Sequence, residues 1–244
     1  MRVVFSLAYW AYAGLSLLVL FPGALLIFLA TYFFDRRRVL LHLYTCMWGY
    51  MYVAFHPLWS AVFEGKEKLP WRGGAVIVAN HLSLVDILVM HGTFRPFKWV
   101  SKAEMFRVPF IGWDMALNDY VRVWRGDRES VKRMLAHCRR HLDNGSSLVI
   151  FPEGTRSRDG KMLPFKDGAF KLAQEAGVPV IPVAIHGSGL ALPVAGLIFR
   201  NRVRIRVRVL DPLDPKAFAS VGELRDAARD VIARNVAELA ALDG

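Results

Sequence analysis

Hydrophobic and polar positions divide the chain into an apolar amino-terminal part and a longer part in which short apolar runs alternate with amphipathic stretches. No charged side chain occurs from Val3 to Phe34, a run of 32 residues, or from Val39 to Phe63, a run of 25 residues. A helix needs about 20 apolar residues to cross a bilayer. We therefore expect residues 1–64 to be membrane-anchoring hydrophobic helices and residues 65–244 to form a separate domain.

The first apolar run is too long for a cleaved signal peptide, whose apolar core has about 7–15 residues. Pro22 and Gly23 stand inside this run and can kink or break a helix. Asp35 and the arginines 36–38 end it, and arginines beside an apolar segment favour the cytoplasmic side. Two arrangements stay open: the first run spans the membrane while the second, rich in aromatics, lies in the interface, or both enter one leaflet as a hairpin.

From residue 75 onward, short β-branched runs alternate with helical patterns. This alternation predicts an α/β domain with a largely parallel, mixed sheet flanked by helices. Gly145 and Gly177 follow two of the helical patterns and are typical helix stops. The expected strands are Ala75–Ala79, Phe97–Val100, Tyr120–Trp124, Ser147–Phe151, Val178–Ile185 and Val203–Leu210, and the expected helices are Val85–His91, Glu129–Asp143, Ala169–Ala176 and Gly222–Ala241.

The chain carries a net charge of +11, of which +9 falls in residues 65–244, so anionic partners are expected. Arginine alternates with valine and isoleucine over Arg202–Arg208, which predicts a solvated strand face at the edge of the sheet. No nucleic-acid-binding signature accompanies it, and we expect no nucleic-acid partner. Cys46 and Cys138 lack paired spacing, so neither a disulfide framework nor a zinc site is suggested.

A histidine and an aspartate follow the first expected strand, in the sequence Asn-His-Leu-Ser-Leu-Val-Asp at residues 80–86. On one continuous helix, His81 and Asp86 would lie about 140° apart, but a turn followed by a helix lets them meet. Such a carboxylate fixes the imidazole tautomer while the other ring nitrogen accepts a proton. The alternative is a structural histidine beside a helix-capping Ser83. One histidine and one carboxylate are too few for a metal.

No nucleophile elbow surrounds Ser83, so this pair indicates a reaction in which the substrate itself brings the hydroxyl. A second motif, Phe-Pro-Glu-Gly-Thr-Arg-Ser at residues 151–157, follows another apolar strand. Gly154 permits close backbone approach, Arg156 offers a fork for phosphate oxygens, and Glu153 could hold that arginine. The alternative is a charged surface turn. Lys102, Arg125 and Lys166 could complete a cationic phosphate pocket with Arg156.

The order of four motifs resembles the glycerolipid acyltransferases of the 1-acylglycerol-3-phosphate O-acyltransferase type. These are the His–Asp motif, a Lys-x-Glu segment with a strand ending in arginine, the Phe-Pro-Glu-Gly-Thr-Arg-Ser motif, and the Val178–Ile185 strand. The resemblance covers about Ala75 to Gly189. It implies transfer of a fatty acyl group from acyl-CoA or acyl carrier protein to lysophosphatidic acid, giving phosphatidic acid in phospholipid biosynthesis, with no cofactor.

The resemblance also implies residue roles. His81 would be the general base and Asp86 would orient it; Lys102, Arg125, Glu153, Gly154, Thr155 and Arg156 would bind substrate. It implies an enzyme on the inner (cytoplasmic) membrane, beside anionic headgroups, with its catalytic domain facing the cytosol. Asp119 and Trp124 depart from the family pattern, which leaves another lysolipid, such as a lyso-ornithine lipid, open as acceptor. A membrane-anchored lipid hydrolase is the less favoured alternative.

Overall fold

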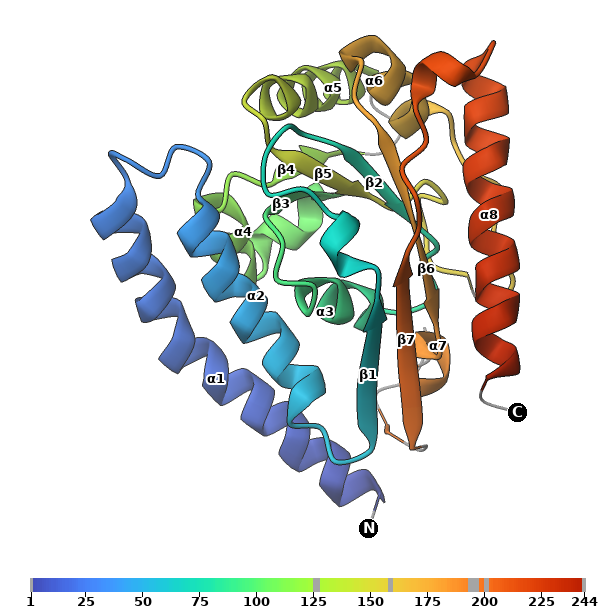
Figure 1. The fold of residues 1–244 in the computed structure, drawn as a ribbon. Helices are drawn as coiled ribbons and strands as arrows, with labels where there is room; N and C mark the ends of the chain where they lie inside the picture. The colour runs from blue at the N-terminus through green and yellow to red at the C-terminus, as the bar shows by residue number, and fades with distance from the viewer. Residues whose placement is uncertain (1, 125–127, 158–159, 193–197, 200–201, 243–244) are drawn as a thin grey trace.

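A computed structural model gives the arrangement of the helices and strands (Figure 1), and it describes residues 2–124, 128–157, 160–192, 198–199 and 202–242. The strands are β1 (Trp59–Glu64), β2 (Val76–Ala79), β3 (Phe97–Lys102), β4 (Val121–Val123), β5 (Ser147–Ile150), β6 (Val180–His186) and β7 (Val203–Val209). The α-helices are α1 (Arg2–Thr31), α2 (Val39–Ala54), α3 (Val85–His91), α4 (Ile111–Leu117), α5 (Arg128–Asp143), α6 (Gly168–Ala176), α7 (Ser188–Ala191) and α8 (Val221–Ala241). Short 3-10 helices occupy Lys66–Lys68, Ala103–Arg107 and Pro215–Ala217.

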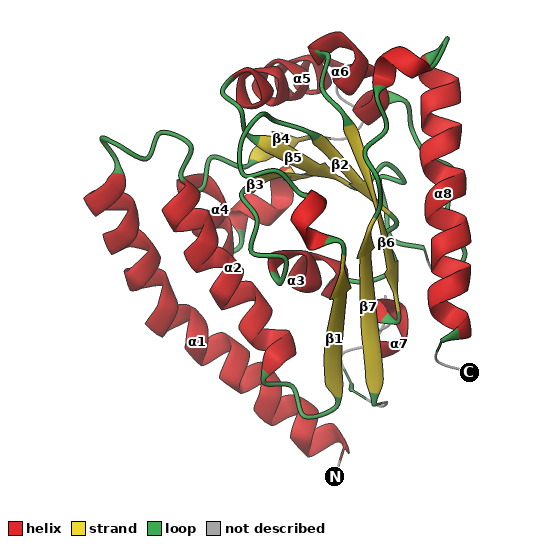
Figure 2. Ribbon diagram, in the orientation of Figure 1, coloured by secondary structure: helices red, strands yellow, loops and turns green. Residues whose placement is uncertain are grey.

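All seven strands form one sheet in the order β1-β7-β6-β2-β5-β3-β4 (Figure 2). The neighbouring pairs are parallel except β6 and β7, which are antiparallel. This confirms the predicted α/β fold with a largely parallel, mixed sheet. The carboxyl ends of β2, β5, β6 and β3 meet at one edge of the sheet, which is where open α/β sheets place their ligands.

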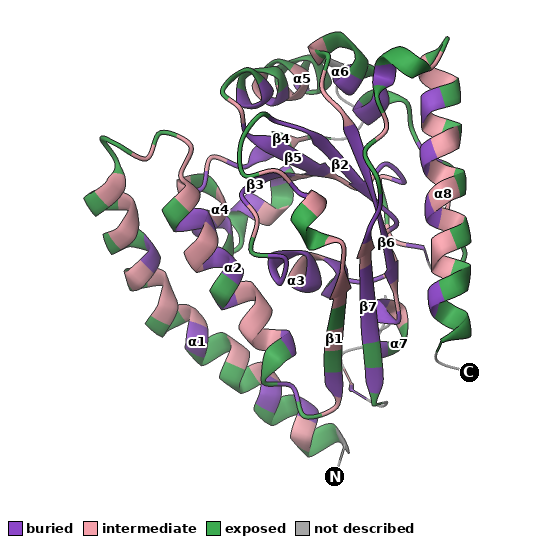
Figure 3. Ribbon diagram, in the orientation of Figure 1, coloured by how far each residue is buried: buried purple, intermediate pink, exposed green. Residues whose placement is uncertain are grey.

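Most strand residues of the sheet are buried between the helices (Figure 3), and alternating side chains supply two cores, one on each face. Ile77 and Ala79 of β2 face a core that includes residues of α1, α2, α3 and α7. Val76 and Val78 face the other core, which includes residues of α5, α6 and α8. All four residues of β2 are buried, as expected for a central parallel strand covered by helices on both faces.

Helix α1 packs along α2, and its outer face remains exposed (Figure 1). It continues through Pro22 and Gly23, and the missing side chain at Gly23 lets the Tyr44 hydroxyl of α2 donate to the Leu20 carbonyl at 2.9 Å. Val3–Thr31 is long and apolar enough to cross a membrane, and only 11% of its most apolar stretch is buried. By contrast, α2 buries one side against the domain through Leu41, Thr45 and other residues.

The prediction of one apolar membrane segment over Val39–Phe63 is wrong for its last part. Helix α2 ends at Ala54, and Trp59–Glu64 forms β1, an edge strand paired in parallel with β7. Its apolar side chains serve the sheet core: Trp59 is buried and Phe63 packs against that core. An apolar run is compatible with a membrane helix or a buried strand, and periodicity alone does not separate them.

The alternating arginines of Arg202–Arg208 predicted a strand at the edge of the sheet. This prediction is wrong, because β1 pairs with β7 on its outer side. β7 lies between β1 and β6, hydrogen-bonded on both sides. Arg208 contacts Glu64 of β1 at 2.6 Å and Glu238 of α8 at 2.8 Å, and Arg206 is only 9% exposed. Arg208 therefore connects β7 to β1 and α8, while Arg202 and Arg204 remain exposed.

Candidate active site

His81 and Asp86 lie at the carboxyl end of β2, on the turn and the first helical residues that follow it. β2 ends at Ala79 and α3 begins at Val85, so the histidine occupies the turn and the aspartate the first turn of the helix. The side chain of Asn80 fixes this turn to β6, because it donates to the Ile185 carbonyl at 2.8 Å and accepts from the Ile185 N–H at 2.9 Å.

The two side chains meet as the turn-then-helix arrangement requires. His81 Nδ1 lies 2.8 Å from Asp86 Oδ2, and the same oxygen accepts from the N–H groups of Leu82 at 2.7 Å and Ser83 at 2.8 Å. Asp86 is fully buried, and the His81 side chain is 14% exposed. A carboxylate acceptor places the ring proton on Nδ1, which leaves the lone pair of Nε2 for another partner. Within the described residues, nothing hydrogen-bonds to that nitrogen.

Aromatic packing holds the imidazole plane. The His81 ring stacks on Phe151, with centroids 3.9 Å apart and planes 10° apart. Trp99 of β3 in turn stacks on Phe151, with ring centroids 5.6 Å apart. With the Asp86 hydrogen bond, this stack leaves the ring little freedom to turn, so Nε2 has a fixed direction.

Glu153 is tied to the His81 backbone and not to Arg156 as expected. Its Oε1 accepts from the His81 N–H at 2.7 Å, its Oε2 accepts from the Leu163 N–H at 2.8 Å, and the residue is only 3% exposed. Burial raises the pKa of this carboxyl to about 7, while the two N–H donors favour its charged form. The expectation that Glu153 holds Arg156 is therefore wrong: the described residues show no hydrogen bond or ion pair between the two, and the carboxylate oxygens face backbone N–H groups instead.

The loop after Glu153 returns to the histidine. The Ser157 N–H donates to the His81 carbonyl at 3.0 Å. Gly154 has φ +71°, a backbone conformation that favours glycine, and a Cβ there would lie 2.8 Å from Lys166 Nζ, so the lysine tip would have to move. Thr155 is exposed and Arg156 half-buried, and in the described part of the chain Arg156 has no hydrogen bond or ion pair. The structure thus brings Gly154–Arg156 beside His81, with Lys166 against the loop.

Two other predicted residues are not joined to this group. Lys102 is exposed at the carboxyl end of β3, the same edge of the sheet but two strands away from β2. Arg125 lies outside the described residues. Their predicted contact with phosphate stays a prediction.

Ser83, the serine nearest in sequence to the histidine, is fully engaged elsewhere. Its hydroxyl donates to the Leu192 carbonyl at 2.6 Å and accepts from the Val85 N–H at 3.2 Å, and the residue is completely buried. It therefore caps the start of α3 and fixes it to the segment after α7, which leaves it unsuited to attack a substrate.

Comparison with known proteins places this arrangement in a family. The model of the family described as Acyltransferase matches residues 60–186, about half of the chain. A 1-acyl-sn-glycerol-3-phosphate acyltransferase of Chlamydomonas reinhardtii is 35% identical over 95% of this chain and 69% of its own. A protein of the same name from Pseudomonas aeruginosa is 30% identical over 72% of this chain and 68% of its own.

A solved structure agrees over nearly the full length. The crystal structure of the 1-acyl-sn-glycerophosphate acyltransferase of Thermotoga maritima superposes with a TM-score of 0.79 at 30% identity, covering 99% of this chain and 98% of that one. The predicted resemblance to glycerolipid acyltransferases is thereby confirmed, and this chain belongs to the acyltransferase family.

Proposed function

We propose that this protein transfers a fatty acyl group from a thioester, either acyl-CoA or acyl carrier protein, to the free hydroxyl of lysophosphatidic acid, giving phosphatidic acid. The observation that carries this proposal is the His81–Asp86 pair, which directs an unpartnered Nε2 away from a buried carboxylate. The names of the similar proteins, which are acyltransferases for 1-acyl-sn-glycerol-3-phosphate, agree with it.

In the proposed reaction, His81 Nε2 takes the proton of the acceptor hydroxyl as that oxygen attacks the thioester carbonyl. Asp86 keeps the proton on Nδ1 and stabilises the resulting imidazolium. The tetrahedral intermediate then collapses, the new ester C–O bond remains, the C–S bond breaks, and the leaving thiolate receives the proton from Nε2. A donor such as Lys102 or a backbone N–H would stabilise the oxyanion, an effect worth about 10²–10³ in rate.

This reaction needs no acyl-enzyme intermediate. Ser83 is buried with both hydrogen-bonding functions of its hydroxyl in use, which argues against the hydrolase alternative. A hydrolase of this architecture would need a nucleophile beside His81 or an activated water, and it would release fatty acid without an acceptor.

For the acceptor we propose a phosphate pocket built from Gly154, Thr155 and Arg156, with Lys102 and Arg125 contributing charge. Arg156 is half-buried next to the loop that carries His81, so its guanidinium is available to a phosphate. We assign Glu153 a positioning role, because its oxygens already bond the His81 and Leu163 N–H groups. A lyso-ornithine lipid, which lacks the phosphate, would make less use of Arg156.

We further propose that α1 lies in one leaflet of the inner membrane, with the catalytic domain in the cytosol. α2 buries residues such as Leu41 and Val53 against the domain, so it stays packed on the domain when the helix pair meets the bilayer. α1 packs on α2 and exposes an apolar outer face that includes Leu15, Val19 and Leu26. This arrangement favours the hairpin in one leaflet over a full span, because a span would separate α1 from α2. Basic surface beside anionic headgroups would add about 1 kcal/mol per residue.

The test is an assay of the purified protein in detergent, with a labelled acyl thioester and a panel of lysolipids. Phosphatidic acid from lysophosphatidic acid supports the proposal. A product from another lysolipid alone would keep the mechanism but change the acceptor, and release of fatty acid without any acceptor would support the hydrolase. Protease access to the loop at residues 32–38 in sealed inside-out vesicles, but not in right-side-out vesicles, is expected for a cytosolic domain with α1 in the inner leaflet.

A further inference from the structure

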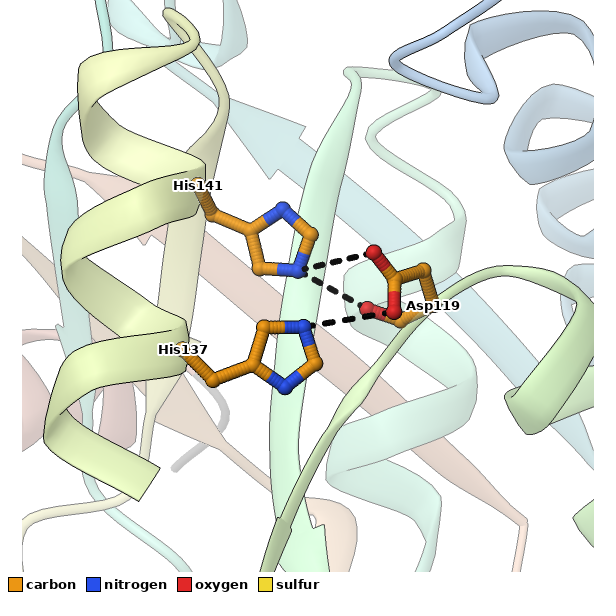
Figure 4. Close-up of side chains that lie close together, drawn as sticks. All are labelled: Asp119, His137 and His141. Atoms are coloured by element: carbon orange, nitrogen blue, oxygen red, sulfur yellow. Dashed lines mark hydrogen bonds and ion pairs between the residues drawn. The ribbon is translucent and has the colours of Figure 1, made fainter. Parts of the chain in front are cut away.

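Three potential metal ligands gather where α5 crosses the segment that leads into β4 (Figure 4). Asp119 stands between α4 and β4, and His137 and His141 project from the same face of α5, since residues four apart are neighbours on a helix. One ligand atom from each of the three residues lies within 4.8 Å of the others. We call these three residues the Asp119 cluster.

Two distances within the cluster are close to those between neighbouring ligand atoms of one cation. His137 Nε2 lies 3.2 Å from Asp119 Oδ1, and His141 Nε2 lies 3.6 Å from Asp119 Oδ2. Zinc bonds of about 2.0–2.2 Å in a tetrahedral geometry separate neighbouring ligand atoms by about 3.4 Å. The imidazole rings are 4.6 Å apart with planes inclined by 26°, and both Nε2 atoms lie on the side of Asp119 (Figure 4).

The backbone also holds Asp119 in an unusual state. Its φ is +56°, in the region that favours glycine. The strained residue presents its carboxylate to two imidazoles, and His137 Nε2 is shielded from solvent without a well-formed hydrogen bond to any described residue. A lone pair that faces a carboxylate is repelled unless a proton or a cation lies between them.

We propose that Asp119, His137 and His141 bind one divalent cation of the zinc type, with a water molecule as fourth ligand. Two imidazoles and one carboxylate are a ligand set that suits zinc and its first-row neighbours. The side chains of His137 and Asp119 are 25% and 39% exposed, and both line a hollow of about 300 Å³ that admits an ion and leaves room for the water. His141, at 7% exposed, anchors the inner side.

Two positive groups lie nearby and set the expected strength of binding. Arg140 Nη2 is 3.6 Å from Asp119 Oδ2, but its side chain is 62% exposed and can turn to solvent. Lys98 Nζ is buried and donates to the Asn118 carbonyl at 2.7 Å, one residue before the cluster. Repulsion between these two side chains and the cation makes binding weaker than in a closed site with thiolate ligands. When the cation binds, His141 Nε2 exchanges its hydrogen bond to the Asp119 carbonyl for a bond to the ion.

The Asp119 cluster and His81 lie at opposite ends of the parallel strands. Asp119 precedes the amino end of β4, while His81 follows the carboxyl end of β2, and the intervening strands β3 and β5 run parallel to both. The Asp119 cluster is therefore at the amino ends of these strands and His81 is at their carboxyl ends. The cation would fasten the carboxyl half of α5 to the α4–β4 connection, a structural role that does not depend on the proposed acyl transfer.

The experiment uses the full chain in detergent, freed of any affinity tag and stripped with a chelator. Cobalt(II) is added as a spectroscopic probe, and its displacement by zinc is followed through the visible absorption of tetrahedral cobalt; thermal unfolding is measured with and without zinc. The variants are Asp119→Asn, His137→Gln and Asp119→Gly, and the control is Asp143→Asn, an exposed carboxylate at the end of the same helix. Glycine suits the positive φ of position 119, so this variant should fold.

We expect about one cation per chain, an unfolding temperature raised by zinc in wild type and Asp143→Asn, and a dissociation constant increased by at least about tenfold in the three cluster variants. A wild-type protein that shows no saturable binding, or cluster variants that bind as tightly as Asp143→Asn, would overturn the proposal. In that case the three residues form only a hydrogen-bonded ion cluster with Arg140.

Discussion

His81 Nδ1 and Asp86 Oδ2 are 2.8 Å apart, and the aspartate oxygen receives two backbone N–H groups besides the imidazole. One carboxylate oxygen therefore organises the turn after β2 and orients the ring at the same time. The contact depends on a turn at 80–84 followed by a helix from Val85, since five residues of continuous helix would separate the two side chains.

Asp86→Asn should lower kcat by about 10²–10⁴, because an amide can present its NH₂ to Nδ1 and favour the unproductive tautomer. KM for both substrates should change little, since Asp86 is completely buried. Steady-state kinetics check this, with circular dichroism to confirm the fold. A variant with wild-type kcat would remove Asp86 from the orientation of His81.

Glu153→Gln should reduce kcat by about tenfold or more with a smaller change in KM. A glutamine has one acceptor oxygen, so either the His81 N–H or the Leu163 N–H would face an NH₂ group, and the histidine turn would shift. Glu175→Gln, an exposed glutamate of α6, is the matched control. If the main effect is a weaker acceptor KM instead, Glu153 contacts the substrate and does not merely position the turn.

Arg156→Ala should raise KM for lysophosphatidic acid by about 10–100-fold, because a hydrogen bond to a charged group is worth about 1.5–3 kcal/mol. KM for a lysolipid without a phosphate monoester should change much less. Lys171→Ala, which removes an exposed cation of α6, controls for general loss of positive charge. Equal effects on both acceptors would place Arg156 outside the phosphate pocket.

Val19→Asp should weaken binding to anionic vesicles by about tenfold or more, since an aspartate in the apolar region of a bilayer costs about 2.5–3.5 kcal/mol. Val19 is 67% exposed on the outer face of α1. Leu242→Asp, at a residue 57% exposed just beyond α8, is the control and should bind as wild type does. Flotation of the protein with vesicles measures both, and identical behaviour of the two variants would argue against α1 as the anchor.

Asp114→Asn should stabilise the protein at alkaline pH. Burial raises the pKa of Asp114 to about 7, so the unfolded chain, with a pKa of about 3.9, releases this proton at lower pH than the folded one. The favourable contribution of the neutral carboxyl is complete below about pH 4 and is lost as the pH rises to about 7. The free energies of unfolding of variant and wild type should therefore diverge from about pH 5 to about pH 8, by about 1–3 kcal/mol, and thermal unfolding at each pH measures them. Parallel curves would contradict the raised pKa.

Much of the fold follows from local pattern. Helix α3 has the predicted bounds, and the six predicted strands form with ends within two residues of those expected. β1 could not be separated from the apolar run that contains it, because its partner β7 is far away in the sequence. The position of β7 inside the sheet was missed for the same reason. Helix α4, whose seven residues carry no clear amphipathic pattern, was also not predicted.

The site was predictable in its residue types but not in its contacts. The motif spacing indicated the His81–Asp86 contact, whereas the partners of Glu153 depend on how two loops from β2 and β5 meet. The spacing of His137 and His141 on a predicted helix was a visible signal of the Asp119 cluster. Asp119 joins them only through the packing of α5 against the β4 segment, and no sequence pattern reports that.

The role of His81 as general base is tested by product formation in wild type and His81→Ala, supplied with a labelled acyl thioester and lysophosphatidic acid under identical conditions. We expect phosphatidic acid from wild type, a loss of about 10²–10⁴ in rate for the folded variant, and no acyl group attached to the protein by mass spectrometry. Undiminished turnover by His81→Ala, or a covalent acyl-enzyme in wild type, would contradict it.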